Sequence, residues 1–226
     1  MAMIFKKTFE ALIPEEKQEK IKNWLSKKNC SMLFEICDPT INPHIVPYDK
    51  PHIVLLDIVY NDIEQPMTLM GWESLKALNF GLFDLELKKM VKEIKDKEEM
   101  RAFVESCYGE PNINHEGFVC KDKTGYMIKF KTADYIFWKA MRSMFAAVDN
   151  SEYGALPTYW RTMDFMKERY SEDVFNHYRQ VFDETIAILL DKFGKMDARN
   201  EKKQLPSGFM RDNNLNLIKV RKIVNK

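Results

Sequence analysis

Two lysines, Lys129 and Lys131, stand two positions apart near the end of the alternating segment GYMIKFKT (125–132). Side chains at positions i and i+2 of a β-strand point to the same face, with Cα atoms about 6 to 7 Å apart. Two ammonium groups at that spacing repel each other unless an anion lies between them. They can bind different oxygens of one phosphate group. The alternative is a solvated edge strand, where lysine discourages aggregation.

An acid and a glycine precede this segment, in HEGFVCKD (115–122). The Glu116 carboxylate can hold a divalent cation or a water, and Gly117 allows a ligand to approach the backbone closely. The two segments are expected to form a β-hairpin with its turn at DKTG. This arrangement suits nucleotidyl transfer, in which an enzyme positions phosphates and neutralises developing charge.

The overall composition gives no general attraction to a polyanion. The 226 residues are 45% hydrophobic and 31% charged, which indicates a folded protein rather than a disordered one. Lys and Arg number 35 and Asp and Glu 34, so the formal net charge is only +1. A site for a nucleotide or a nucleic acid must therefore be local.

The cysteines and the N-terminus indicate an intracellular protein. Cys30, Cys37, Cys107 and Cys120 include no CxxC pair, and with four histidines they offer no zinc spacing. Reduced, packed thiols are the favoured interpretation. The first 20 residues do not resemble a signal peptide, and no apolar run reaches the roughly 18 residues that a membrane span needs. We therefore expect a cytoplasmic protein that does not bind membranes.

The elements that must position the hairpin can be read from periodicity and turn signals. The pattern predicts an amphipathic helix over 14–29 and a strand over 31–37. PHIVLLDIVY (51–60) is almost continuously apolar, as in a strand covered on both faces. A short helix is expected over 72–80, a strand over 81–90, and a helix over 96–107 that begins at Asp96 as N-cap.

The pattern becomes helical after Thr132. Helices are predicted over 133–148, 158–170 and 171–194, with apolar residues at helical spacing. The tail, NLNLIKVRKIVNK (214–226), alternates apolar and polar residues and suggests a last strand or a frayed end. Two modules follow from this change, a mixed α/β region over 1–132 and a helical region over 133–226.

Two long segments resemble one enzyme family. EGFVCKDKTGYMIKFKTADYIFWKAMRS (116–143) resembles the paired motifs IV and V of the RNA ligases of T-even bacteriophage type, members of the covalent nucleotidyltransferase superfamily. MLFEICDPTINPHIVPYDKPHIVLLDIVY (32–60) resembles motif III and the strand after it. The order of the motifs agrees too. The resemblance implies an α+β fold: a partial nucleotidyltransferase domain, ATP-grasp-like with an antiparallel sheet (1–132), followed by an all-helical domain (133–226).

The resemblance also implies roles for individual residues. Glu35 would contact the ribose of a bound adenylate, and Glu116 would act near the catalytic magnesium ion, with Gly117 beside it. Lys129 and Lys131 would hold the nucleotide phosphate where charge develops during transfer. The implied cofactors are ATP or AMP and Mg²⁺, and the implied partners are RNA ends, tRNA among them.

One element of the family pattern is missing. The family attacks ATP with a deprotonated lysine in a KxxG or KxDG element upstream of motif III. No lysine before Glu35 is followed by a glycine at that offset, and the first glycine of the chain is Gly71. The chain is therefore expected to begin downstream of the nucleophile and not to adenylylate itself by the standard route.

Three interpretations stay open. The first is a split or truncated ATP-dependent RNA ligase whose nucleophile comes from a complementing N-terminal polypeptide; because missing strands expose apolar edges, a partner or a homodimer is expected. The second is an enzyme that seals RNA ends already adenylylated. The third is a non-catalytic RNA- or protein-binding remnant. We favour an RNA ligase that joins or repairs RNA ends.

Basic residues in the helical region offer a further RNA surface. Charged helix faces are usually only solvated, so this interpretation is weaker than that of the hairpin. The residues are Lys139, Arg142, Arg161, Lys167 and Arg169.

Overall fold

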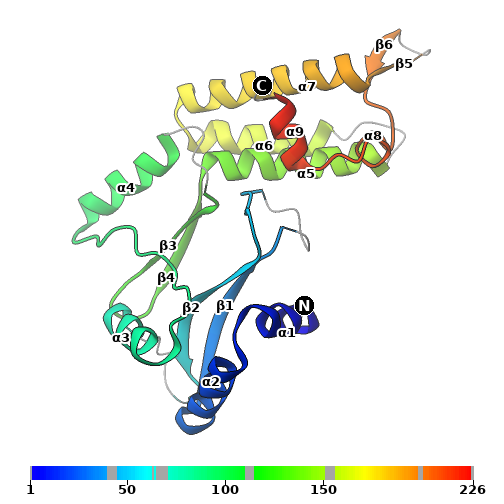
Figure 1. Cartoon of the computed structure of the whole chain (residues 1–226). Helices are drawn as coiled ribbons and strands as arrows, with labels where there is room; N and C mark the ends of the chain where they lie inside the picture. Colours follow the sequence, from blue (N-terminus) through cyan, green and yellow to red (C-terminus); the bar gives the residue numbers. More distant parts are fainter. Residues whose placement is uncertain are drawn as a thin grey trace. The chain divides into compact units, whose positions relative to one another are not determined.

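The computed structural model describes residues 2–39, 45–62, 64, 71–109, 115–150, 156–197 and 201–224. Helices and short antiparallel sheets make up this part of the chain (Figure 1), so the α+β class is confirmed. The chain separates into two compact units. Unit 1 comprises Met1–Asn42, Tyr48–Glu93 and Cys120–Ile128, and unit 2 comprises Pro43–Pro47, Ile94–Val119 and Lys129–Lys226. The boundary expected at residue 132 stays a prediction.

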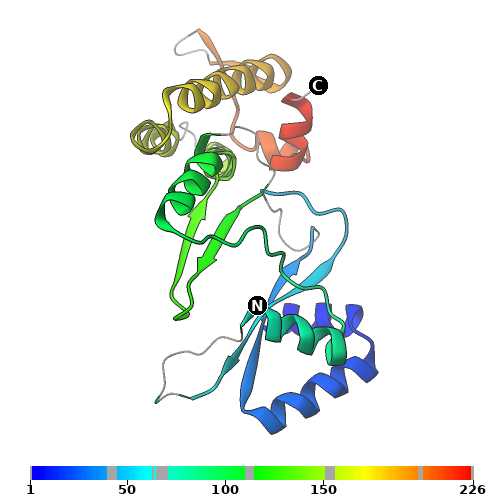
Figure 2. The ribbon, with the colours of Figure 1, turned by 90° about the vertical axis from the view of Figure 1, so that its left-hand side faces the viewer.

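Unit 1 contains a two-stranded sheet with helices on one face (Figure 2), together with residues Cys120–Ile128. Its elements are α1 (Ala2–Leu12), α2 (Glu15–Lys28), β1 (Cys30–Cys37), β2 (His52–Tyr60), α3 (Trp72–Leu78) and a π-helical turn (Asn79–Phe83). The predicted helix over 14–29 and the two predicted strands are confirmed. The strands are antiparallel, and a core that includes Ile21, Leu55 and Phe83 joins them to the helices.

A β-bulge interrupts the pairing of β1 with β2. Leu33 lies opposite Asp57, but the next residue, Phe34, lies opposite Leu55, so β2 has one residue more than β1 here. Leu55 and Ile58 are both fully buried in the core although they are three residues apart. The extra residue thus reverses the alternation of β2 and turns Asp57 to the face opposite the core.

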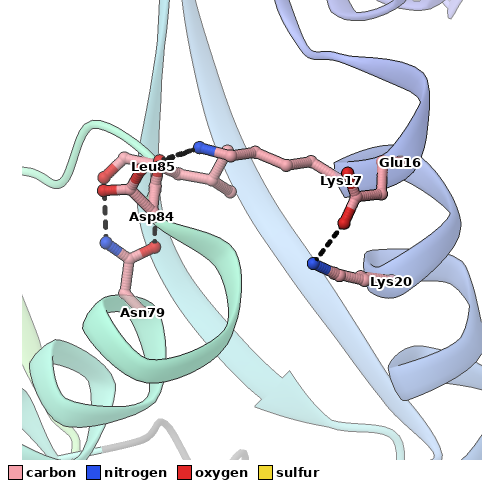
Figure 3. Close-up of polar contacts among 6 residues, drawn as sticks. All are labelled: Glu16, Lys17, Lys20, Asn79, Asp84 and Leu85. Carbon is pink, nitrogen blue, oxygen red and sulfur yellow. Dashed lines mark hydrogen bonds and ion pairs between the residues drawn. The ribbon is translucent and has the colours of Figure 1, made fainter.

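The strand expected over 81–90 is wrong. Residues 79–83 form the π-helical turn, which continues α3, and Leu87 makes only an isolated parallel bridge to Leu55. The buried Asn79 side chain explains the difference, because it binds both backbone groups of Leu85: Nδ2 donates to the carbonyl at 2.9 Å and Oδ1 accepts from the N–H at 3.1 Å (Figure 3). A side chain that satisfies backbone groups in this way competes with strand pairing.

A lysine from α2 binds the residue at the end of the same turn. Lys17 Nζ donates to the Asp84 carbonyl at 2.8 Å and to its carboxylate at 2.9 Å (Figure 3). Asp84 itself has a left-handed backbone conformation, with φ of 49°, which reverses the chain direction. The turn is therefore tied both to its own helix and to α2.

Unit 2 is mainly helical, with α5, α6 and α7 side by side (Figure 1). The helices predicted after residue 132 and the helix that begins after Asp96 are confirmed. The elements outside the hairpin are α4 (Lys97–Gly109), α5 (Ala133–Asn150), α6 (Leu156–Arg169), α7 (Glu172–Phe193), β5 (Lys195–Asp197), β6 (Lys202–Gln204), α8 (Phe209–Asp212) and α9 (Leu217–Val224). None of the described helices is both long and apolar enough to cross a bilayer.

The C-terminal segment is helix α9, so the expectation of a strand or a frayed end is wrong. Asn216 Oδ1 accepts from the Lys219 N–H at 2.9 Å and caps the helix. Leu217 and Val220 are buried on one face at a spacing of three residues. The burial of these residues at helical spacing decides the structure of this segment. The alternation of apolar and polar residues did not indicate that spacing.

One arginine joins α9 to α5 and to residues 45–47. Arg221 Nη2 lies 3.3 Å from Asp134 Oδ2, and Nη1 donates to the Ile45 carbonyl at 3.0 Å. The guanidinium also lies 4.9 Å from the centre of the Trp138 ring. Burial raises the pKa of Asp134, although the charge of Arg221 acts in the opposite direction.

Replacement of Asn79 by alanine should destabilise the protein. Asn79→Ala leaves the N–H and the carbonyl of Leu85 without their partners, so the free energy of unfolding should fall by about 1 to 3 kcal/mol. Chemical denaturation followed by circular dichroism measures this change. Glu73→Ala, at an exposed position of α3, should change it by less than about 0.5 kcal/mol. Equal stabilities of Asn79→Ala and the wild type would contradict the role of these bonds.

Candidate active site

The predicted hairpin forms from β3 (Gly117–Lys121) and β4 (Met127–Lys131). At its turn the Asp122 N–H donates to the Tyr126 carbonyl at 3.0 Å, and at its open end the Thr132 N–H donates to the Glu116 carbonyl at 3.2 Å. Both bonds belong to the same antiparallel register. The turn lies at DKTG, as expected. Glu116 is therefore brought beside the end of β4 that carries Lys131.

Thr132 fixes the junction between β4 and α5. Its fully buried hydroxyl accepts from the Tyr135 N–H at 3.2 Å and donates to the His115 carbonyl at 2.8 Å. The side chain thus caps the helix and also ties it to the residue that precedes Glu116. Lys131, immediately before this cap, has a firmly held backbone.

The side chains of Glu116 and Lys131 meet at the open end of the hairpin. Lys131 Nζ donates to Glu116 Oε1 in an ion pair that is only partly exposed, 24% for the lysine side chain and 39% for the glutamate side chain. The same ammonium lies 4.6 Å from the centre of the Tyr135 ring. Lys129 is exposed on the same strand. An acid, two lysines and an aromatic ring thus meet in unit 2.

The pKa of Glu116 lies below its usual range. Burial acts to raise it, but the hydrogen bond and charge of Lys131 outweigh burial, with smaller contributions from Lys129 and a hydrogen bond to Tyr135. The carboxylate is therefore ionised at neutral pH.

The pKa of Lys131 is also lowered. Burial is the largest cause, and the neighbouring Lys129 acts in the same direction, while the bond to Glu116 partly opposes both. One carboxylate thus does not compensate fully for desolvation and for a second positive charge. An added anion would relieve this imbalance.

Gly117 is required by the hairpin itself. A Cβ atom on this residue would lie 2.2 Å from the Phe130 carbonyl oxygen and 2.8 Å from the Lys131 Cα. Its φ of 153° is also one that residues with side chains rarely adopt. The backbone that approaches Gly117 closely is therefore that of β4. Its predicted contact with a nucleotide stays a prediction.

Glu35 lies in unit 1, on β1 opposite Val54. Its side chain is exposed, on the face that also carries Leu33 and lies opposite the core. The structure thus brings Glu116, Lys129 and Lys131 together, whereas the convergence of Glu35 with them stays a prediction.

Tyr135 is a site residue that sequence reasoning missed. Its position four residues after Lys131, in the first turn of the following helix, was the available signal. An aromatic ring at this place can contact the end of the lysine side chain, and it does so.

No three His, Cys, Asp or Glu side chains gather as metal ligands in the part of the chain that the structure describes. Mg²⁺ commonly uses one or two carboxylates together with substrate phosphates and water. The single, ionised Glu116 carboxylate fits this mode of binding.

A comparison with protein families identifies the relationship of this chain. A family model described as RNA ligase matches residues 2–135, more than half of the chain. The chain belongs to the RNA ligase family. The matched range includes every residue of the candidate active site and ends in the first turn of α5. No curated protein gives a significant match.

The lowered pKa of Lys131 in this RNA ligase family member can be measured and its causes separated. The Lys131 side chain should titrate at a lower pH than a lysine in an unfolded peptide, as followed by NMR of its Cε resonance. Glu116→Gln should lower this pKa further, because the opposing carboxylate is lost. Lys129→Ala should raise it, because a neighbouring positive charge is removed. Shifts of the opposite sign in the two variants would contradict the described electrostatics.

Proposed function

We propose that this RNA ligase family member joins or repairs RNA ends by adenylate transfer, with the transferred phosphate bound between Lys129 and Lys131. The observation that carries this proposal is the partly buried ammonium of Lys131, whose charge Glu116 only partly balances. Family membership supports RNA as the substrate. A partial nucleotidyltransferase domain of ATP-grasp-like type is the fold that we propose around these residues.

The sealing step uses only groups that this chain can supply. In an RNA end activated with AMP, the 3′-hydroxyl of the other end attacks the 5′-phosphorus and releases its proton to water. The new 3′–5′ phosphodiester forms, and the bond to the AMP phosphate breaks. The departing AMP phosphate takes the electron pair of that bond. Lys129 and Lys131 stabilise the charge that develops on the phosphates, and the hairpin holds them there before the reaction begins.

Glu116 has two functions in this proposal. In the free protein it keeps the Lys131 ammonium in place and partly neutralised. When a phosphate replaces it as the partner of Lys131, its carboxylate becomes available to a cation. Mg²⁺ bound by Glu116 and by substrate phosphates would supply further charge neutralisation. The Tyr135 ring maintains the position of the lysine during this exchange.

The ATP-dependent step needs a nucleophile that this chain does not offer at the family's position. No KxxG or KxDG element occurs before Glu35. We propose that the lysine comes from outside residues 1–226, on a complementing polypeptide that completes the domain. A cytoplasmic location is also proposed, which the buried thiols of Cys30, Cys37 and Cys107 support.

The absence of a KxxG or KxDG element before Glu35 also favours a second candidate function. A chain with the phosphate-binding residues but without the lysine can serve as a non-catalytic RNA-binding remnant of a ligase. The two candidates predict different results for sealing but the same result for RNA binding.

The purified chain should seal an RNA 5′ end that has been adenylylated chemically, in the presence of Mg²⁺ and without ATP. Lys131→Ala should reduce the sealing rate by about 10²-fold or more, because it removes a charge that stabilises the transition state. Lys192→Ala, an exposed lysine of α7, is the matched control and should leave the rate unchanged. Ligated product is measured on denaturing gels.

Two outcomes would overturn parts of this proposal. RNA binding without any sealing would favour the non-catalytic remnant. Covalent labelling of the chain alone by α-labelled ATP would show that a lysine within residues 1–226 is the nucleophile.

A further inference from the structure

We propose a second phosphate-binding site in unit 1, formed by Lys88 and Lys121 and positioned by Asp57. Its ligand is a phosphodiester of the bound RNA strand. The identity of this ligand rests on the proposed function, whereas the site itself rests on residues that the candidate active site does not use.

Asp57 holds two ammonium groups with one carboxylate oxygen. Oδ2 lies 2.8 Å from Lys88 Nζ and 3.5 Å from Lys121 Nζ, and Oδ1 accepts from the Ile58 N–H at 3.0 Å. The Asp57 residue is only 4% exposed. Burial of a carboxylate is unfavourable unless its charge is paired. Both oxygens of Asp57 are engaged, and the two lysines are kept as neighbours.

Three separate segments must come together to make this cluster. The β-bulge in β2 turns Asp57 away from the core, as bulges near functional sites often redirect a side chain. Lys88 follows the π-helical turn, and its N–H donates to the Leu55 carbonyl at 3.0 Å, which aligns residues 86–88 with β2. Lys121 is the last residue of β3. Lys88 alone attaches residues 86–88 to the Asp57 carboxylate, and Lys121 adds a second ammonium group from a third segment.

The cluster has the exposure that a phosphate site needs. The Lys88 and Lys121 side chains are 35% and 26% exposed, so an incoming phosphate can reach both. Leu33, opposite Asp57 and 43% exposed, offers apolar surface to a ribose or base beside that phosphate. The exposed Glu35 carboxylate on the same face repels phosphate, which favours binding at the Asp57 end of the sheet.

RNA affinity tests the site without catalysis. Binding of a fluorescent single-stranded oligoribonucleotide with a 5′-hydroxyl end, in the absence of ATP and Mg²⁺, is measured by anisotropy at several salt concentrations. Lys88→Ala and Lys121→Ala should each weaken binding about five- to tenfold and reduce the salt slope by about 0.7 per lost phosphate contact. Lys89→Ala, an exposed neighbour, is the matched control and should bind as the wild type does.

The variant Asp57→Asn separates the positioning of the two lysines from the effect of net charge on RNA binding. It makes the protein more positive by one charge, so general attraction would tighten RNA binding. Loss of positioning should instead weaken it several-fold, with the folded state checked by circular dichroism. Wild-type or tighter affinity in folded Asp57→Asn, or wild-type affinity in both alanine variants, would overturn the proposal. Displacement of the RNA by inorganic phosphate at the same concentration as the RNA would also show that a phosphodiester of the strand is not the ligand.

Failure of this inference is distinguishable from failure of the proposed function. RNA binding that depends on Lys88 without any sealing supports the site and contradicts the ligase activity. Sealing that depends on Lys131, with RNA affinity independent of Lys88 and Lys121, supports the activity and contradicts the site.

Discussion

The ion pair between Glu116 and Lys131 is the contact on which the functional account depends. It joins the two strands at the open end of the β3–β4 hairpin, where both side chains are only partly exposed to water. Because Gly117 has no side chain, the strands approach closely enough for the pair to form. Because burial and Lys129 both disfavour the charge of Lys131, the site has more positive charge than one carboxylate balances. A phosphate is the ligand that we propose for this site.

The helical part of unit 2 fixes the position of this ion pair. Lys131 directly precedes Thr132, whose hydroxyl caps α5. That helix is in turn held by buried aromatic contacts, such as Phe137 against Tyr178 with ring centres 4.9 Å apart, and by Arg221 on Asp134. Positioning of charged groups before a reaction begins is what makes electrostatic stabilisation effective.

Local signals in the sequence predicted most of the elements but not the irregular ones. Apolar periodicity and the DKTG turn gave the hairpin, the amphipathic helix and the helices after Thr132, because these depend on neighbouring residues. The π-helical turn was missed because it depends on one buried side chain, Asn79, that bonds a residue six positions away. The bulge that redirects Asp57 was missed because it is a property of strand pairing. In the candidate site, the types and spacing of Glu116, Lys129 and Lys131 suggested these three residues, whose roles stay predictions, whereas Tyr135 required the helix to be placed.

The most direct test of the central claim is an NMR titration of Lys131 with AMP. The account predicts that AMP shifts the Lys131 Cε resonance saturably and raises the pKa of this lysine, because a phosphate adds negative charge beside the ammonium. Lys192 should not respond. An unchanged Lys131 resonance and pKa at saturating AMP would contradict the account.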